Sequence, residues 1–280
     1  MGDKSTQLAI IGAGPGGYAA AFLAADLGLQ VTLIDPAANP GGVCLYRGCI
    51  PSKTLLHAAH LLQEARNGAQ WGLTFKDLAV DVDVLRQRKD RVVAQLTEGL
   101  GQLVKRRKIT YIRGTAVFKD DKTLEVKALE GEKSALRFEN AVVASGSRAV
   151  SLPLFADAGE RVLDATAALD LEDIPDRLLV VGGGYIGLEL GSAYAAMGSK
   201  VSVVEMTSGL LPGCDRDLVS QLKRRLDTQL EAIMLSTKVL ELKEQKNGVM
   251  VSLEDKKGEA TKKRFDKVLI SIGRLPNTEN

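Results

Sequence analysis

Residues that coordinate metals, crosslink secreted proteins or stack on bases are scarce in this chain. Its 280 residues include two histidines, three cysteines and one tryptophan. Three cysteines are too few for a secreted disulfide framework, so we expect a reducing compartment, namely the cytoplasm. His57 and His60 share one helix face, but no acidic or cysteine ligand is arranged beside them, and no metal site is expected. Trp71 and the scattered tyrosines form no platform for stacking bases.

An excess of charge of one sign is also missing. Lysine and arginine total 37 against 35 aspartate and glutamate, which gives a formal net charge of +2. This balance indicates neither nucleic acid nor an anionic membrane surface as a partner. The basic run 105–108 follows a long amphipathic stretch and is typical of a helix C-terminus, where cations are electrostatically favoured.

Long apolar runs are absent as well. No stretch of about 18 apolar residues occurs, so no membrane-spanning helix is expected. Residues 1–7 are polar and lead directly into an apolar strand, which predicts that no targeting segment is present. The length of the chain suits about two domains, each large enough for its own core.

Two segments repeat the order strand, glycine-rich turn, helix, strand, acidic residue. The first turn, GAGPGG, begins at Gly12, and the strand after its helix ends at Asp35. The second turn, GGGYIG, begins at Gly182, and the corresponding strand ends at Glu205. The two turns and the two acids are separated by the same interval, since 182 − 12 equals 205 − 35. The sequence therefore predicts an α/β protein with two Rossmann-like dinucleotide-binding domains of three-layer β/β/α architecture.

The other elements are predicted from hydrophobic periodicity and turn signals. Helices are expected at about 51–66, 84–105 and 216–229. A buried strand at 142–146 should return the chain to the first sheet, after short β segments near 110–112, 115–118 and 123–126. Glycine-containing turns at 246–248 and 257–258 predict β-hairpins in the second domain.

The glycines of each fingerprint have different tasks. The first permits the tight turn, the second lets the backbone approach the pyrophosphate, and the third allows the helix to pack closely on the strand. The helix N-terminus supplies N–H groups and a favourable dipole for the phosphates. Asp35 and Glu205 are expected to accept hydrogen bonds from the ribose hydroxyls. The predicted glycines are Gly12, Gly14 and Gly17 in the first site, and Gly182, Gly184 and Gly187 in the second.

Two dinucleotide sites imply two electron carriers. Glu205 would repel a 2′-phosphate, and residues 206–208 offer no arginine to bind one, so NAD is favoured over NADP. Hydride on nicotinamide must become electrons on a disulfide, and a flavin performs that conversion. We therefore expect FAD in domain 1–150, which contains a pair of cysteines, and NAD in domain 151–280.

That pair, Cys44 and Cys49, lies in the run GGVCLYRGCIPSK at residues 41–53. The spacer is too long for a thioredoxin-type C-x-x-C, and no second pair completes a zinc site. Pro51 suits a helix start, so the cysteines should lie at and just before a helix N-terminus, which favours thiolate. The prediction is a redox disulfide; a structural disulfide or two buried free cysteines is the alternative. Cys214 is expected to be buried as a small apolar residue or exposed without a role.

With these motifs, residues 8–277 resemble the FAD-dependent pyridine nucleotide–disulfide oxidoreductases. The active segment of that family, GGTCLNVGCIPSK, differs here at Val43, Tyr46 and Arg47. The sequence after the second cysteine is similar to the lipoamide branch, the dihydrolipoamide dehydrogenases. Glutathione and trypanothione reductases usually carry a second lysine where Ser52 stands.

The resemblance assigns roles to several residues. It implies that Cys44 is the interchange thiol that attacks the dithiolane, and that Cys49 lies against the flavin as the charge-transfer thiolate. It also implies an ion pair of Lys53 with Glu189 near the flavin ring. Further positions that match family motifs for cofactor binding are Gly42, Lys53, Ser145 and Gly146 (in A-S-G-S), and Gly273 and Arg274 (in G-R-L-P-N).

The function implied is dihydrolipoamide dehydrogenation, in which electrons pass from protein-bound dihydrolipoamide through the disulfide and FAD to NAD. The expected partners are lipoyl domains of 2-oxoacid dehydrogenase or glycine cleavage complexes, and a second copy in a homodimer. Two alternatives stay open. One is another NAD(P)H-dependent disulfide reductase or a mercuric reductase, and the other is a nucleotide-binding or scaffold subunit without full turnover.

Members of the family normally continue with a second flavin contact and an interface domain. That domain supplies a histidine–glutamate pair, whose histidine serves the partner's interchange thiol as acid and base. The sequence resembles the first two domains of such an enzyme. We therefore expect weakened flavin binding and low lipoamide turnover from these 280 residues alone.

Overall fold

The computed structural model describes residues 4–131, 133–156 and 159–279. The chain divides into two compact units. The first unit comprises Met1–Pro51, Asp90–Arg148 and Pro276–Asn280, and the second comprises Ser52–Lys89 and Ala149–Leu275. Within the described ranges, no helix has the length and apolar character needed to cross a membrane.

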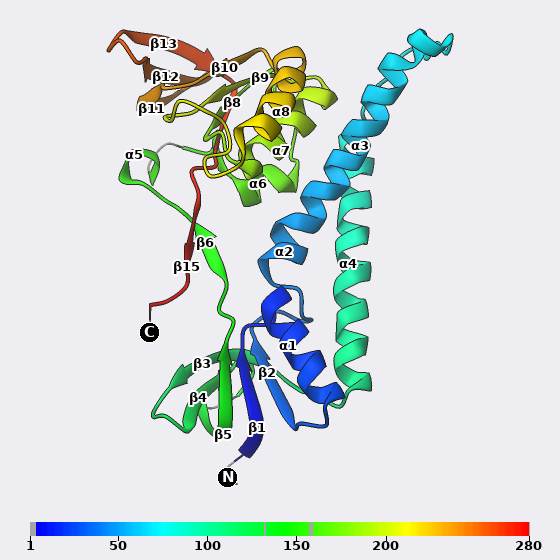
Figure 1. The fold of residues 1–280 in the computed structure, drawn as a ribbon, viewed down its shortest axis with the longest axis vertical. Coiled ribbons are helices and arrows are strands. Elements are labelled where there is room, and N and C mark those ends of the chain that lie inside the picture. The colour runs from blue at the N-terminus through cyan, green and yellow to red at the C-terminus, as the bar shows by residue number, and fades with distance from the viewer. Residues whose placement is uncertain (1–3, 132, 157–158, 280) are drawn as a thin grey trace. The chain divides into compact units, whose positions relative to one another are not determined.

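The first unit is built on a closed sheet of five strands in the order β1-β2-β3-β4-β5 (Figure 1). β1 runs parallel to β2 and to β5, and β2 parallel to β3, whereas β4 is antiparallel to both of its neighbours. The strands are β1 (Lys4–Ile11), β2 (Val31–Asp35), β3 (Thr110–Phe118), β4 (Thr123–Ala128) and β5 (Lys133–Val143). The helices that lie wholly within the unit are α1 (Pro15–Asp26) and α2 (Gly42–Arg47).

Two predictions about these strands need correction. The segments expected near 110–112 and 115–118 form one strand, because Gly114 lets β4 approach so closely that a Cβ there would meet the backbone of Lys127. The strand expected at 142–146 begins much earlier, at Lys133. The early part of β5 pairs with β4 and the later part with β1, which closes the sheet.

The two faces of β1 and β2 support different layers. Ile10 and Leu33 are fully buried with Ala21 of α1, whereas their neighbours Ala9 and Ile34 pack on the opposite side. Side chains alternate along a strand, so these adjacent residues face opposite layers. The second cluster is completed by residues of β4 and β5, namely Leu124, Val126, Leu136 and Phe138. This is the predicted β/β/α layering.

The second unit has a parallel sheet in the order β10-β9-β8-β14-β7. Its strands are β7 (Val162–Asp164), β8 (Arg177–Val181), β9 (Lys200–Val204), β10 (Ala232–Met234) and β14 (Lys267–Ile270). Its helices include α5 (Pro153–Ala156), α6 (Ala165–Asp170), α7 (Tyr185–Met197) and α8 (Arg216–Gln229). A separate antiparallel sheet holds the predicted hairpins, β11 (Lys238–Gln245), β12 (Gly248–Glu254) and β13 (Ala260–Phe265).

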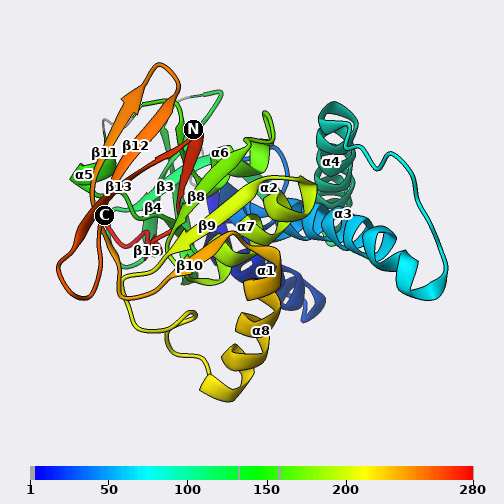
Figure 2. The ribbon, with the colours of Figure 1, turned by 90° about the horizontal axis from the view of Figure 1, so that it is seen from above.

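The layers of the second unit repeat those of the first. Val180 of β8 is buried in the cluster that includes Leu190 of α7, and α7 lies along β8 and β9 (Figure 2). The next residues on each side, Leu179 and Val181, pack instead with Val251 of the antiparallel sheet. The prediction of an α/β protein with Rossmann-type units is therefore confirmed.

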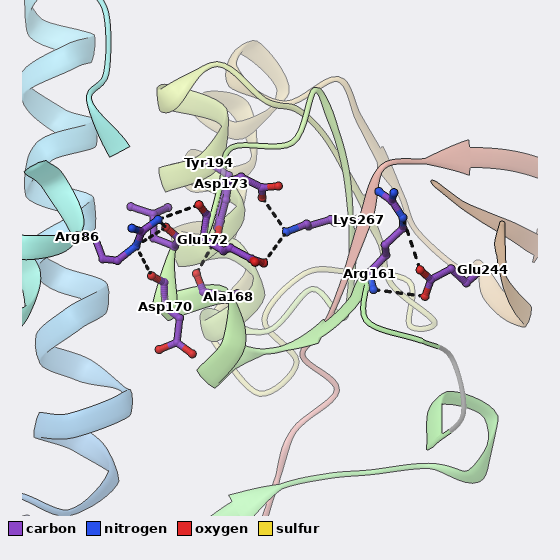
Figure 3. A network of polar contacts seen from close by, with 10 residues as sticks. Arg86, Arg161, Ala168, Asp170, Glu172, Asp173, Tyr194, Glu244 and Lys267 are labelled. Atoms are coloured by element: carbon purple, nitrogen blue, oxygen red, sulfur yellow. Dashed lines mark hydrogen bonds and ion pairs between the residues drawn. The ribbon is translucent and has the colours of Figure 1, made fainter. Parts of the chain in front are cut away.

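Two predicted helices, α3 (Cys49–Asn67) and α4 (Val82–Arg106), flank the short helix η1 (Gly68–Trp71). Within the second unit, Arg66 on α3 donates to the carbonyl of Ala196 on α7 at 2.6 Å. Arg86 on α4 donates to backbone carbonyls at the end of α6 (Figure 3). Lys89 on the same helix also donates to a carbonyl there. Those carbonyls belong to Leu169, Asp170, Leu171 and Glu172. These bonds explain why residues 52–89 cluster with the second unit.

Two short strands, β6 (Ser147–Ala149) and β15 (Arg274–Pro276), pair in a sheet of their own. Each contains one of the positions at which the chain passes from one unit to the other.

Candidate dinucleotide sites and the cysteine segment

The turn after β1 depends on glycine at two of its three predicted positions, Gly12 and Gly17. Gly12 has φ +96°, and a Cβ on it would meet the carbonyl of Ala144. A Cβ on Gly17 would meet the carbonyl of Gly12, so α1 packs directly on the turn. Gly14 is the N-cap of α1 and Pro15 is its first residue, which leaves the helix N-terminus without a side-chain cap. Free N–H groups at that end are what a phosphate requires.

Asp35, at the end of β2, is joined to this turn. Its Oδ2 accepts a 2.8 Å hydrogen bond from the N–H of Ala13, and its Oδ1 accepts one of 2.9 Å from the N–H of Ala37. The loop then returns, because the N–H of Gly41 donates to the carbonyl of Ala13 at 2.8 Å. A carboxylate has about four acceptor positions, so Asp35 retains capacity for ribose hydroxyls.

Gly42 brings the cysteine segment to the same turn. Its φ is +58°, and a Cβ on it would meet the backbone of Gly14. The first residue of α2 therefore lies against the first turn of α1, with no room for a side chain between them. These close approaches fit a dinucleotide in the first unit, because only glycine leaves the backbone accessible there.

The second fingerprint repeats this geometry. Gly182 has φ +109°, and a Cβ on it would meet the carbonyl of Ser271. A Cβ on Gly187 would meet the carbonyl of Gly182, and Gly184 is the N-cap of α7. This turn is thus packed as closely as the first.

Glu205 occupies the position of Asp35. Its Oε2 accepts from the N–H of Gly183 and its Oε1 from the N–H of Thr207, both at 2.7 Å. The N–H of Leu211 donates to the carbonyl of Gly183 at 2.9 Å. Each of these contacts has a counterpart at the equivalent positions of the first unit, so the repeat extends from the fingerprint into the following loop.

The two cysteines of the first unit lie on separate helices. Cys44 is within α2 and half-buried, whereas Cys49 is the first residue of α3 and exposed. The expectation that both cysteines sit at and just before one helix N-terminus holds for Cys49 alone. Gly48 ends α2 between them, and its backbone conformation breaks the helical run. The third cysteine, Cys214, is exposed.

Tyr18 is a residue of this region that sequence reasoning missed. Burial raises the pKa of its phenol, and negative charge on Cys44 and then on Cys49 raises that pKa further. The phenol therefore stays protonated at neutral pH. Its ring also contacts Phe22, with ring centroids 5.7 Å apart. The available signal was a tyrosine directly after the glycine pair of the fingerprint.

Lys53 and Glu189, which are both in the second unit, form an ion pair. The Lys53 Nζ lies 2.7 Å from Oε1 and 3.0 Å from Oε2 of Glu189. Ser52 adds a hydrogen bond from its Oγ to Oε2 at 3.1 Å. The carboxylate is therefore oriented by two consecutive residues of α3. The position of this pair beside a flavin stays a prediction.

The remaining predicted residues lie near the chain's two crossings. In the first unit, Ser145 Oγ donates to the carbonyl of Asn277 at 2.6 Å, and the N–H of Asn277 donates to the carbonyl of Gly146 at 2.9 Å. The A-S-G-S and G-R-L-P-N stretches therefore bind each other. Gly273 has φ +123°, and Arg274 begins β15.

Comparison with known proteins gives one family. The family model described as pyridine nucleotide-disulphide oxidoreductase matches residues 6–280, and the chain belongs to this family. The predicted family, the pyridine nucleotide–disulfide oxidoreductases, is confirmed.

Two curated relatives show which branch of the family the chain resembles. The chain is 43% identical over 275 residues to dihydrolipoyl dehydrogenase from Haemophilus influenzae, and 41% identical over 276 residues to that from Staphylococcus aureus. These alignments cover 98% of this chain and 57% and 58% of the relatives. The chain thus spans little more than half the length of the curated relatives it matches.

A solved structure agrees in fold. The Cu(II) complex of the HOCl-induced flavoprotein disulfide reductase RclA from Escherichia coli matches with a TM-score of 0.82 at 31% identity. The match covers 99% of this chain and 58% of that one.

Proposed function

We propose that this protein is the cofactor-binding part of a dihydrolipoamide dehydrogenase, which oxidises protein-bound dihydrolipoamide with NAD. The observation that carries the proposal is the cysteine segment, whose Gly42 lies against the first fingerprint. The names and identities of the curated relatives support the same substrate. In this proposal FAD binds the first unit and NAD the second.

The chemistry assigned to the cysteines is a thiol–disulfide exchange. A substrate thiolate attacks the Cys44 sulfur of the disulfide, which breaks the bond to Cys49 and releases the Cys49 thiolate. The second substrate thiol then displaces Cys44 and closes the dithiolane, so the substrate loses two electrons and the cysteine pair gains them. When bound, FAD supplies the two-electron transfer from this dithiol to nicotinamide.

Other residues of the segment would support this exchange. Cys49 is the first residue of α3, so its sulfur is carried at the N-terminus of that helix. The Tyr18 phenol keeps its proton, because burial and then negative charge on Cys44 and Cys49 raise its pKa. Lys53, fixed by Glu189, would orient toward the flavin at the start of the same helix.

The proposed partners are lipoyl domains of 2-oxoacid dehydrogenase or glycine cleavage complexes, and a second copy of the chain in a homodimer. We place the protein in the cytoplasm, because a catalytic dithiol is kept reducible in a reducing compartment.

The exchange step can be tested without full turnover. Oxidised protein is mixed with a reduced lipoyl domain, and the free thiols are then alkylated and located by mass spectrometry. We expect new thiols at Cys44 and Cys49. Cys44→Ser should abolish this exchange, and Cys214→Ser is the matched control that should leave it unchanged. Equal reduction of wild type and Cys44→Ser would contradict the proposal.

A second candidate function is that of another disulfide reductase with the same fold. The likeness to a flavoprotein disulfide reductase favours it. Faster reduction of the Cys44–Cys49 pair by NADH than by dihydrolipoyl domains, with transfer to a different disulfide substrate, would select it. Nucleotide binding without any change in the cysteines would select the scaffold alternative.

A further inference from the structure

The loop at residues 206–214, here called the β9 loop, follows Glu205 at the carboxyl end of the parallel sheet. In open α/β sheets that end is where the dinucleotide lies. Leu210 is 1% exposed and packs against Gly183, so the loop rests directly on the fingerprint turn. Leu211 also donates its N–H to the carbonyl of Gly183. The β9 loop therefore forms the border of the predicted ribose position.

The conformation of this loop is not one that its backbone would hold alone. It contains no helix or strand. Leu211 has φ +50°, a left-handed conformation that is unfavourable for a residue with a side chain. A restraint from outside the loop is needed to keep its carbonyls in one arrangement.

Arg216, the first residue of α8, supplies that restraint. Its guanidinium donates four hydrogen bonds to three loop carbonyls. Nε and Nη2 bind Cys214 O at 2.9 and 2.6 Å, Nη1 binds Leu210 O at 2.9 Å, and Nη2 binds Leu211 O at 2.6 Å. The planar, forked guanidinium suits several acceptors held in fixed positions.

In the first unit, the residue at the equivalent position also holds the loop after the acid, but through a hydroxyl group. Tyr46 is the counterpart of Arg216 in the repeat, since 216 − 46 equals 205 − 35, and its hydroxyl donates to the carbonyl of Asn39 at 3.0 Å. Asn39 belongs to the loop after Asp35, the counterpart of the β9 loop. In both units the residue eleven positions beyond the acid (46 − 35 and 216 − 205) therefore fixes a carbonyl of the loop that follows the acid.

We infer that Arg216 is a positioning residue for the adenosine half of the dinucleotide in the second unit. It holds the β9 loop so that Glu205 and the fingerprint turn meet the ribose in one geometry. This inference rests on the proposed NAD site. It also concerns specificity, since Arg216 is the only basic residue between Glu205 and Asp217. With its donors directed at carbonyls, Arg216 serves the loop and not a 2′-phosphate.

The test is a titration of the 280-residue protein with NADH and with NADPH, followed by nicotinamide fluorescence. Arg216→Ala should weaken NADH binding about tenfold, equivalent to about 1.4 kcal/mol. Arg216→Lys, which keeps the charge and three donors, should restore part of the affinity. The matched control is Arg224→Ala, which removes an exposed cation from the same helix and should bind NADH as wild type does.

Three results would overturn the inference. The first is NADH affinity of Arg216→Ala equal to that of Arg224→Ala, even where the melting temperature falls, since the role would then be structural alone. The second is a greater loss of NADPH than of NADH affinity in Arg216→Ala, because the guanidinium would then be a phosphate ligand. The third is a wild type that binds FAD but neither nicotinamide dinucleotide, which overturns the proposed NAD site as well. In the first two cases the proposed function stands.

Discussion

Asp35 and Glu205 make the same two backbone contacts, yet the loops behind them are held by unlike side chains. In the first unit two tyrosine hydroxyls bind the loop, Tyr46 at Asn39 and Tyr111 at Ala37. In the second unit one guanidinium does so. The shared contacts involve backbone atoms of the turn, which any dinucleotide fingerprint must present. The side chains that hold the loop only need to reach a carbonyl, so they differ between the units.

The largest effects on stability are expected in the two glycine-rich turns, where the two units are most alike. Gly17→Ala and Gly187→Ala would place a methyl group against the carbonyls of Gly12 and Gly182. Each should lower the free energy of unfolding by about 2–3 kcal/mol, because a rigid backbone cannot move aside. Thermal melting measures the loss.

Gly16→Ala is the control for this pair, since a Cβ there meets no atom within 4 Å. It should melt at or slightly above the wild-type temperature, because alanine favours the helix. If Gly17→Ala also melted like wild type, the close packing of α1 on the turn would be wrong.

Substitution of the two acidic residues should produce the next largest losses of stability. Glu205→Ala leaves the N–H groups of Gly183 and Thr207 without their acceptor, at a cost of about 1–3 kcal/mol in unfolding free energy. Asp35→Ala should cost less, because Asp35 is less buried than Glu205. Denaturant unfolding checks both values.

Glu205→Gln tests charge separately from hydrogen bonding. The amide retains an acceptor but no longer repels a 2′-phosphate, so the ratio of NADPH to NADH affinity should rise. Asp35→Asn is the matched change in the other unit and should leave that ratio unaltered. An unchanged ratio in Glu205→Gln would remove the electrostatic basis for NAD preference.

A smaller effect distinguishes the buried tyrosines of the two units. Tyr194 donates to the carbonyl of Ala168 at 2.8 Å and is 3% exposed, whereas Tyr111 is half-buried. Burial raises the pKa of both, followed by acidic neighbours, led by Asp173 for Tyr194 and by Asp35 for Tyr111. Tyr194→Phe should cost about 1 kcal/mol of unfolding free energy, and Tyr111→Phe somewhat less.

These raised pKa values also predict a dependence on pH. As pH rises, the unfolded chain loses its tyrosine protons first, at about pH 10. The stabilisation is therefore complete below that pH and is lost as pH approaches the folded-state pKa values. Melting temperatures of wild type should fall above about pH 10, and less steeply in Tyr194→Phe. Identical slopes would contradict the assignment.

Sequence reasoning succeeded where the signal was local and repeated. The helix predicted at 216–229 is α8, and one interval relates both Gly12 to Gly182 and Asp35 to Glu205. Such elements are specified by glycine, apolar periodicity and one acid at the end of a strand. Their positions follow from the chain itself.

Sequence reasoning missed features that depend on contacts between residues distant in sequence. The assignment of residues 52–89 to the second unit rests on Arg66, Arg86 and Lys89, whose acceptors are backbone carbonyls. Every residue has a backbone carbonyl, so no sequence motif indicates which carbonyl an arginine will bind. Arg216 has no sequence signal for the same reason, and Tyr46 differs from the family segment without indicating which carbonyl it binds.

The smallest effect tests whether Tyr46 and Arg216 are equivalent. Tyr46→Asn, the family residue, should change FAD affinity by about twofold, or about 0.4 kcal/mol, because Tyr111 still holds the loop after Asp35. The double variant Tyr46→Phe/Tyr111→Phe should lose more FAD affinity than the two single changes together, since each tyrosine compensates for the other. Strict additivity would mean that the hydroxyls act independently. In the second unit the single substitution at Arg216 removes four hydrogen bonds to the loop at once, so it should have the greater effect.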